Sequence, residues 1–300
     1  MAWRIVYVTD VDELSLNMNS LKVKKGDFDL KVPLSDIFAV VIEDLTVRVS
    51  TRLLVELSNY NILVVICNQK HLPECYIQPI SGHYGQYSQM QNQLSWKKDD
   101  KEKLWQKIVR QKILNQAKVM EIMMAEYHRI EKLHYLGMNV EINDPRNHEA
   151  QAARIYFNSF YEDFNRDDEE IIENAALNYG YTILHSAIAR TIVAKGLIPA
   201  LGIRHIGVRN HFNLASDFIE PFRPIVDLFI LKNPPGPFLT KEYRLHLINI
   251  MHARIYIDGK QQTLIRAIEI MIQSIIDYFS EGDTNKLKLP NLERYQFYEL

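Results

Sequence analysis

The period of the hydrophobic pattern changes once along the chain, and this change limits the folds that the chain can adopt. Residues 1–80 contain short runs typical of β-strands, among them IFAVVI and ILVVIC. The run KVKKGDFDLKV alternates polar and apolar residues about Gly26, which predicts a hairpin. One helix interrupts the strands over STRLLVELSNYN, with Ser50 as its N-cap. The first part of the chain is therefore predicted to be a small domain dominated by sheet.

From Asp99 onward the apolar residues recur at helical spacing. Leu104 and Ile108 begin one buried stripe of a long helix. Asp144 and Pro145 predict the start of another helix, with Asp at the cap and Pro at the first position. Further helices are predicted over residues 168–195, about 212–231, 240–257 and 261–280.

The segment between the two patterns is polar, contains glycines and has little apolar periodicity. We therefore interpret it as a connecting loop. The pattern as a whole predicts an α+β protein in which a β-rich domain precedes a larger, all-α domain. The predicted bounds are 1–80 for the β-rich domain, 81–98 for the connecting loop and 99–300 for the α-helical domain.

Apolar runs and cysteines predict the cellular compartment. No run has the length of a signal-peptide core or a membrane span. Cys67 and Cys75 are the only cysteines, and their spacing matches no zinc motif. We therefore expect a cytoplasmic protein with reduced thiols and no membrane association.

Charge is balanced over the whole chain but segregated along it. The formal net charge is −2, yet the segment from Lys97 to Lys118 holds eight basic and three acidic residues. This segment, with Lys107 and Arg110 in it, is a candidate for contacts with DNA phosphates. The alternative is a solvated helix face.

Glu149 is a carboxylate on an otherwise apolar helix face. At helical spacing it shares that face with Ala152, Ala153, Tyr156 and Phe160. A buried carboxylate is protonated, paired, or bound to a metal ion. An internal ion pair with an arginine is the alternative to a metal ligand.

Two further metal-ligand candidates lie in the run GIRHIGVRNHFNLASDFIEPFRPIVD. His205 stands between Gly202 and Gly207, which predicts a tight loop close to a ligand. Glu220 directly precedes Pro221, and proline disturbs the helix beside it and redirects the glutamate.

A predicted ion pair distinguishes Glu220 from the other acidic residues of this run. Arg223 is expected to pair with Asp227 or with Asp217, which leaves Glu220 unpaired. Two glutamates and one histidine would form a divalent-cation site that suits Mg²⁺ or Mn²⁺.

The same residues carry a family resemblance. NHEAQAARIYF, followed by GLIPALGIRHIG and FNLASDFIEPFRPIVD, is similar to the CRISPR-associated integrase and endonuclease family, the catalytic subunit of spacer acquisition. The resemblance covers the whole chain and is closest to the shorter type II members. It implies that Glu149, His205 and Glu220 are the catalytic metal ligands. Ile198 departs from the family pattern, in which many members have Asp, and this affects the expected loop rather than the ligands.

The resemblance also implies a reaction and partners. The 3′-hydroxyl of a captured DNA fragment would attack a phosphodiester at the end of a CRISPR repeat. The fragment and the repeat, both double-stranded DNA, would be the nucleic-acid partners. A homodimer through the β-rich domains and a complex with the small companion subunit of the adaptation machinery are implied. An effector nuclease and accessory adaptation proteins are further candidate partners. Because they flank His205 in sequence, we expect Lys195, Arg204 and Arg209 to contact DNA.

Two alternatives remain beside this function. One is a metal-dependent phosphodiesterase that acts on another substrate. The other is a non-catalytic DNA-binding scaffold whose carboxylates form internal salt bridges.

Overall fold

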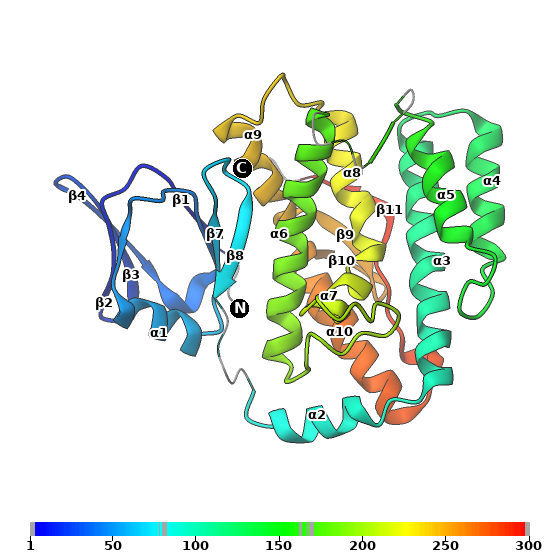
Figure 1. Ribbon diagram of the computed structural model, residues 1–300, viewed down its shortest axis with the longest axis horizontal. Coiled ribbons are helices and arrows are strands. Elements are labelled where there is room, and N and C mark those ends of the chain that lie inside the picture. Colours follow the sequence, from blue (N-terminus) through cyan, green and yellow to red (C-terminus); the bar gives the residue numbers. More distant parts are fainter. Residues whose placement is uncertain are drawn as a thin grey trace. The chain divides into compact units, whose positions relative to one another are not determined.

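The chain forms two compact units, each with its own secondary structure. The computed structural model describes residues 4–77, 79, 83–161, 164–166, 168 and 171–297. Unit 1 comprises Met1–Gln89 and Ala189–Leu197, and unit 2 comprises Met90–Ile188 and Ile198–Leu300. Unit 1 is rich in strands and unit 2 in helices (Figure 1), which confirms the predicted α+β class.

The described residues of unit 1 form two four-stranded sheets, with orders β1-β5-β7-β8 and β4-β3-β2-β6. β1, β5 and β7 are parallel, and β8 is antiparallel to β7. Helix α1 (Thr51–Asn59) accompanies them. The strands are β1 (Arg4–Val8), β2 (Glu13–Asn17), β3 (Ser20–Lys25), β4 (Phe28–Pro33), β5 (Ile37–Ile42), β6 (Arg48–Val49), β7 (Leu63–Cys67) and β8 (Pro73–Ile77).

Local sequence explains the elements of unit 1. Every residue of β5 is buried, as expected for an apolar strand covered on both faces. β3 and β4 form the predicted hairpin, and Gly26 has the positive φ of 55° that its turn needs. The Ser50 side chain accepts a hydrogen bond from the Leu53 amide, which confirms the predicted cap of α1.

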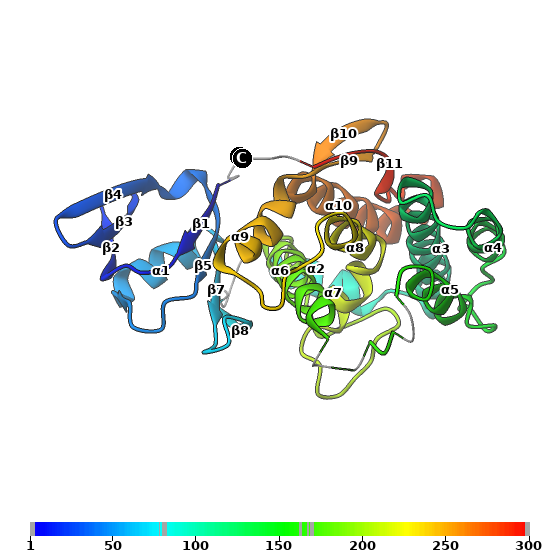
Figure 2. The same cartoon turned by 90° about the horizontal axis from the view of Figure 1, so that it is seen from above.

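Unit 2 is built around the long helix α3. Figures 1 and 2 both show α3, α4 and α5 side by side. Among the described residues, no helix combines the length and the apolar character that crossing a bilayer needs. The helices are α2 (Gln86–Leu94), which begins in unit 1, α3 (Lys98–Ile122), α4 (Tyr127–Met138), α5 (His148–Phe157), α6 (Ile172–Ala194), α7 (Asn213–Phe218), α8 (Arg223–Lys232), α9 (Lys241–Asn249) and α10 (Leu264–Glu281).

The connecting segment and the region after α9 differ from the predicted secondary structure. Residues 86–94, predicted as part of a connecting loop, form α2. The helix predicted over 240–257 ends earlier, and a three-stranded sheet follows within the domain predicted to be all α. Its strands are β9 (Arg254–Ile257), β10 (Lys260–Thr263) and β11 (Asn291–Gln296), in the order β10-β9-β11.

A tight turn explains this small sheet. Asp258 and Gly259 join β9 to β10, with φ values of 53° and 72°. An Asp-Gly pair between two runs is a strong hairpin signal, because both residues adopt positive φ readily. The helical spacing of the preceding apolar residues concealed this signal.

The helix predicted over about 212–231 is broken at its prolines. α7 ends at Phe218, the 3₁₀ turn η2 covers Glu220–Phe222, and α8 begins at Arg223. Pro221 and Pro224 occupy early positions of η2 and α8, where a missing amide hydrogen costs little.

Candidate active site

His205 lies on a tight loop that has no room for a side chain at Gly202. A Cβ atom at Gly202 would lie 2.1 Å from the carbonyl oxygen of His205 and 2.9 Å from Oδ2 of Asp217. At Gly207, the first atom that a Cβ would meet is the Cβ of Asn210, at 3.5 Å. Close approach of the backbone therefore explains the glycine at position 202 but not the one at 207.

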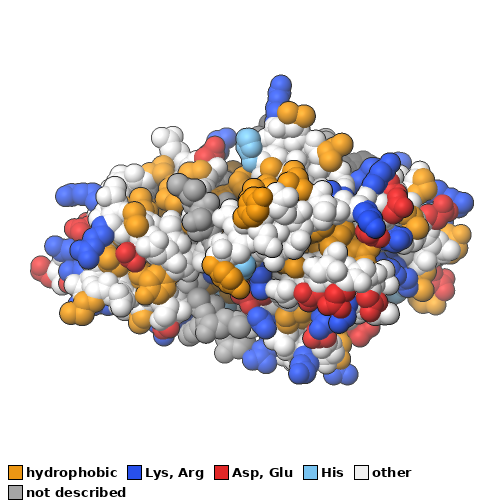
Figure 3. Space-filling model, turned by 90° about the horizontal axis from the view of Figure 1, so that it is seen from below, with side chains coloured by type: hydrophobic (Ala, Val, Ile, Leu, Met, Phe, Trp, Pro, Cys, Tyr) orange, Lys and Arg blue, Asp and Glu red, His pale blue; other side chains and the backbone are white. Residues whose placement is uncertain are grey.

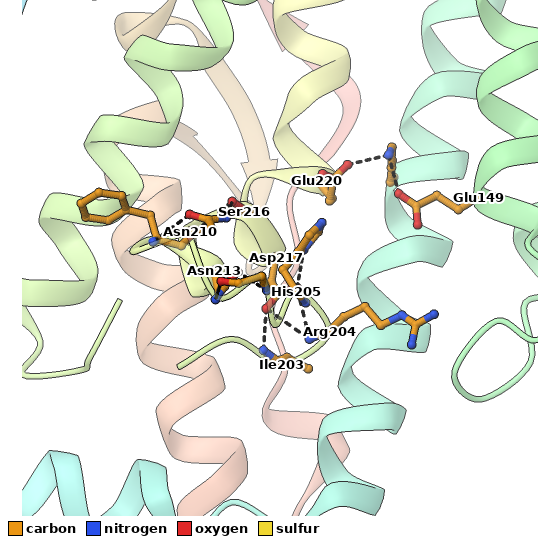
Figure 4. A network of polar contacts seen from close by, with 12 residues as sticks. Glu149, Ile203, Arg204, His205, Asn210, Asn213, Ser216, Asp217 and Glu220 are labelled. Atoms are coloured by element: carbon orange, nitrogen blue, oxygen red, sulfur yellow. Dashed lines mark hydrogen bonds and ion pairs between the residues drawn. The ribbon is translucent and has the colours of Figure 1, made fainter. Parts of the chain in front are cut away.

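The buried carboxylate of Asp217 holds this loop (Figure 4). It accepts hydrogen bonds from the backbone amides of Ile203 at 2.5 Å and His205 at 3.0 Å. Its Oδ1 atom also lies 2.8 Å from Nδ1 of His205. This hydrogen bond raises the pKa of His205 despite the opposing effect of burial. Because Nδ1 is engaged by the carboxylate, Nε2 is the nitrogen left for a ligand.

Glu220 is oriented by the turn η2, which is attached to α3. The Nδ2 atom of the buried Asn115 donates to the carbonyl oxygen of Pro221 at 2.7 Å and to that of Pro290 at 3.0 Å. The first bond satisfies a carbonyl group in the break between α7 and α8, and the second ties the residue before β11 to the same side chain. The Glu220 side chain is only 6% exposed, and it meets a side chain of α3, Lys112.

The ammonium group of Lys112 lies between two of the three candidate ligands. Its Nζ atom is 2.6 Å from Oε1 of Glu149 and 2.5 Å from Oε2 of Glu220. Dashed lines in Figure 4 mark these two ion pairs at the labelled Glu149 and Glu220. The exposed fractions of the three side chains are 12% for Lys112, 26% for Glu149 and 6% for Glu220. Three separate elements, α3, α5 and η2, therefore meet at one cation.

Glu149 lies in the first turn of α5, where local hydrogen bonds fix its backbone. Asp144 accepts from the amides of His148 at 2.9 Å and Glu149 at 3.0 Å. Asn147, in the left-handed conformation, is the N-cap. The helix predicted to begin at Pro145 thus begins at His148, because Asn147 provides the cap that was expected from Asp144.

Arg223 has a different partner from the one predicted. Its Nε atom donates to Oε1 of Glu220 at 3.0 Å. The predicted pairing with Asp217 or Asp227, which would leave Glu220 unpaired, is therefore wrong. Burial alone would raise the pKa of Glu220, but the charges of Lys112 and Arg223 outweigh it and lower this pKa to about 2.

Asp227 belongs to a separate buried contact. The hydroxyl of Tyr181 donates to its Oδ1 atom. Burial raises the pKa of Asp227 to about 6, although the hydrogen bonds that it accepts act in the opposite direction. Asp227 and Glu220, two carboxyl groups seven residues apart, therefore have pKa values on opposite sides of their ordinary range.

The donor set of Glu149, His205 and Glu220 fits a divalent cation chemically. The two carboxylates already accept one cation, the Lys112 ammonium, and Nε2 is the ring nitrogen of His205 that Asp217 does not contact. In the part of the chain that the structure describes, however, no three His, Cys, Asp or Glu side chains approach closely enough to hold one ion. The structure thus brings Glu149 and Glu220 together, with Lys112 between them, but does not close the three residues around a common point.

Candidate DNA-binding side chains fall into three places. Arg204 and Arg209 are exposed on the His205 loop. Lys107 and Arg110 are half-buried on α3, and Lys195 belongs to unit 1. On the face that Figure 3 shows, the coloured Lys and Arg side chains lie among acidic and apolar ones rather than in one continuous band.

Sequence reasoning missed two residues of the site, Lys112 and Asn115. Lys112 was counted only as one charge of a basic segment. A signal for both was present, because Ile108, Lys112, Asn115 and Val119 recur at helical spacing on the inward face of α3. A lysine and an asparagine on a buried face require partners.

Comparison with known proteins identifies relatives of this chain. The family model described as CRISPR associated protein Cas1 matches residues 6–233. The CRISPR-associated endonuclease Cas1 of Neisseria meningitidis serogroup C (strain 8013) is 35% identical over 305 residues, covering 99% of this chain and 100% of the relative.

Solved structures share the fold at low sequence identity. A casposase bound to an integration product superposes with a TM-score of 0.75 and 17% identity, covering 100% of this chain and 95% of the other. A chain of a Cas6-RT-Cas1–Cas2 complex gives a TM-score of 0.73 and 19% identity, covering 95% of this chain and 36% of that longer chain. Since the family model spans most of the chain and the Neisseria relative matches it from end to end, the chain belongs to the Cas1 family.

Proposed function

We propose that this chain is a metal-dependent DNA endonuclease and strand transferase that integrates captured DNA into CRISPR repeats. Family membership supports the class of reaction. The observation that carries the proposal is the convergence of Glu149 and Glu220 on one cationic group; both glutamates also act electrostatically on His205, whose Nδ1 is held by Asp217.

The residues that would hold Mg²⁺ or Mn²⁺ are Glu149, His205 and Glu220. When bound, the ion would lower the pKa of the attacking hydroxyl or water and neutralise charge on the phosphate. Asp217 fixes the ring orientation of His205, and Arg223 keeps Glu220 ionised. The chain itself therefore supplies the orientation of the ligands and their charge state.

DNA and protein partners follow from the same proposal. Arg204 and Arg209, exposed beside His205, are the first candidates for phosphate contacts, followed by Lys107, Arg110 and Lys195. We propose a homodimer through unit 1 and a complex with a Cas2-type companion subunit. One structural relative is part of a Cas6-RT-Cas1–Cas2 complex, and this supports the companion.

A strand-transfer assay with Mn²⁺, a repeat substrate and the companion subunit tests the proposal. Glu149→Gln, His205→Ala and Glu220→Gln should each abolish integration and hydrolysis. His211→Ala is the matched control, because His211 is an exposed histidine on the same loop region. Full activity in all three variants would overturn the metal-site assignment. DNA binding without any Mn²⁺-dependent cleavage or joining in the wild type would favour the scaffold alternative.

A further inference from the structure

Lys112 is a component of the site for which the proposed reaction provides no role. It lies on the inward face of α3, with its side chain only 12% exposed. A lysine is rarely buried to this extent without partners, because loss of hydration disfavours its charged form. Glu149 and Glu220 compensate, and the pKa of Lys112 is raised although burial acts to lower it.

Lys112 balances the negative charges of the two glutamates. The two carboxylates face two cationic side chains, Lys112 and Arg223. Arg223 donates to Oε1 of Glu220, whereas Lys112 contacts both carboxylates. Without Lys112, Glu149 would lose its cationic partner, and two like charges would face one another.

The contact atoms of Lys112 are the ones a metal ion needs. The ammonium contacts one oxygen of each glutamate, Oε1 of Glu149 and Oε2 of Glu220. A divalent ion held jointly by both carboxylates would occupy the space that the ammonium fills. An ammonium and a divalent cation also repel one another strongly at such short distances.

The structure provides a place to which the displaced ammonium can move. A cavity of about 210 Å³ is lined by Lys112, Glu220, Arg223, Tyr181 and Asp227, among others. Lysine has a flexible four-carbon stem, which allows its ammonium to change position toward this cavity.

We infer that Lys112 is a positioning residue that holds the two glutamates together as an internal counter-ion and exchanges with the divalent cation when the site is loaded. This inference rests on the proposed function, because it takes Glu149 and Glu220 as metal ligands. Lys112 then has two opposite effects: it stabilises the protein without metal, and it weakens metal binding by competing for the same oxygens.

Lys112→Met and Lys112→Arg test these opposite effects. Methionine has a similar length but no charge, whereas arginine keeps the charge. Thermal unfolding in EDTA and Mn²⁺ affinity, measured by calorimetry or by electron paramagnetic resonance of free Mn²⁺, are the two readouts. Lys112→Met should lower the melting temperature in EDTA but bind Mn²⁺ at least tenfold more tightly than the wild type. Lys112→Arg should bind Mn²⁺ no more tightly than the wild type.

The outcomes separate this inference from the proposed function. A merely structural lysine would lower stability and metal affinity together, so unchanged or weaker Mn²⁺ binding by Lys112→Met overturns the inference. If Lys112→Met does not fold, Lys112→Gln replaces it under the same criterion. If the wild type binds no Mn²⁺, or if Glu149→Gln and Glu220→Gln bind it as the wild type does, the proposed metal site itself fails.

Discussion

Nδ1 of His205 and Oδ1 of Asp217 lie 2.8 Å apart, and the same carboxylate accepts the backbone amide of His205 at 3.0 Å. One buried side chain therefore fixes both the ring and the backbone of a candidate metal ligand. A carboxylate in this position sets which ring nitrogen is free and increases the basicity of that nitrogen.

Asp217→Asn should weaken Mn²⁺ binding by about 10–100-fold, the range typical of lost carboxylate partners of metal-bound histidines. The amide retains the size of the side chain but loses the negative charge. Isothermal titration with Mn²⁺ measures the effect. Asp258→Asn, an exposed acid paired with Lys288, is the control and should bind Mn²⁺ like the wild type. Unchanged affinity in Asp217→Asn would contradict the positioning role.

Gly202→Ala should disable the site without unfolding the protein. The added Cβ would stand 2.1 Å from a backbone oxygen, so the loop that carries His205 must shift. We expect the rate of strand transfer to fall at least tenfold and the free energy of unfolding to fall by about 1–3 kcal/mol. Gly207→Ala is a matched control on the same loop, since its Cβ meets nothing closer than 3.5 Å. Equal activity of the two variants would show that the close approach at Gly202 does not constrain catalysis.

Asn115→Ala should be costly, because it leaves the carbonyl groups of Pro221 and Pro290 buried without a donor. The free energy of unfolding, measured with urea, should fall by about 2–4 kcal/mol for two unsatisfied carbonyl groups. Asn139→Ala provides the comparison. Asn139 also donates to a backbone carbonyl, that of Tyr135, but it is exposed, so water can replace it. A loss in Asn115→Ala as small as in Asn139→Ala would show that η2 does not depend on α3.

Replacing Arg204 and Arg209 together by Gln should weaken DNA binding and reduce its salt dependence. Each phosphate contact that is lost reduces the slope of log affinity against log salt by about 0.9. Fluorescence anisotropy at several salt concentrations measures both quantities. Arg254→Gln, an exposed arginine of the small sheet, should change neither. If the double variant keeps the wild-type slope, DNA follows another path.

Stability should depend on pH through Asp227. Burial raises its pKa from 3.8 to about 6 in the folded protein. The folded state therefore retains a proton that the unfolded chain has lost, and this contribution to stability disappears as pH rises from about 4 to about 6. Asp227→Asn keeps an acceptor for Tyr181 and removes the titration. Its stability relative to the wild type should increase over this interval, by up to about 3 kcal/mol. A constant difference would contradict the raised pKa.

The sequence predicted those parts of the fold that depend on local pattern. The apolar strand β5, the hairpin at Gly26 and the cap at Ser50 are each determined by a few neighbouring residues. The sheet at β9 was missed because its Asp258-Gly259 turn follows a run whose apolar spacing also fits a helix.

The candidate ligands were predicted from the sequence, but their partners were not. Glu149, His205 and Glu220 stand out by residue type and by the neighbouring glycine and proline residues. Lys112 on α3 pairs with Glu149 on α5, 37 residues away, and with Glu220 on η2. No local pattern fixes such a contact. Arg223 has carboxylates at both i−3 and i+4, and spacing alone does not decide between them; the fold selects Glu220 at i−3.

Helix α3 contacts every element that carries a candidate ligand. Lys112 meets Glu149 and Glu220, Asn115 holds the turn at Pro221, and the ring of Trp105 packs edge-on against His205 with centroids 5.9 Å apart. Substitutions on this face therefore share partners, and their free energies should not add. A change that rotates or shifts this one helix therefore displaces all three ligand positions at once.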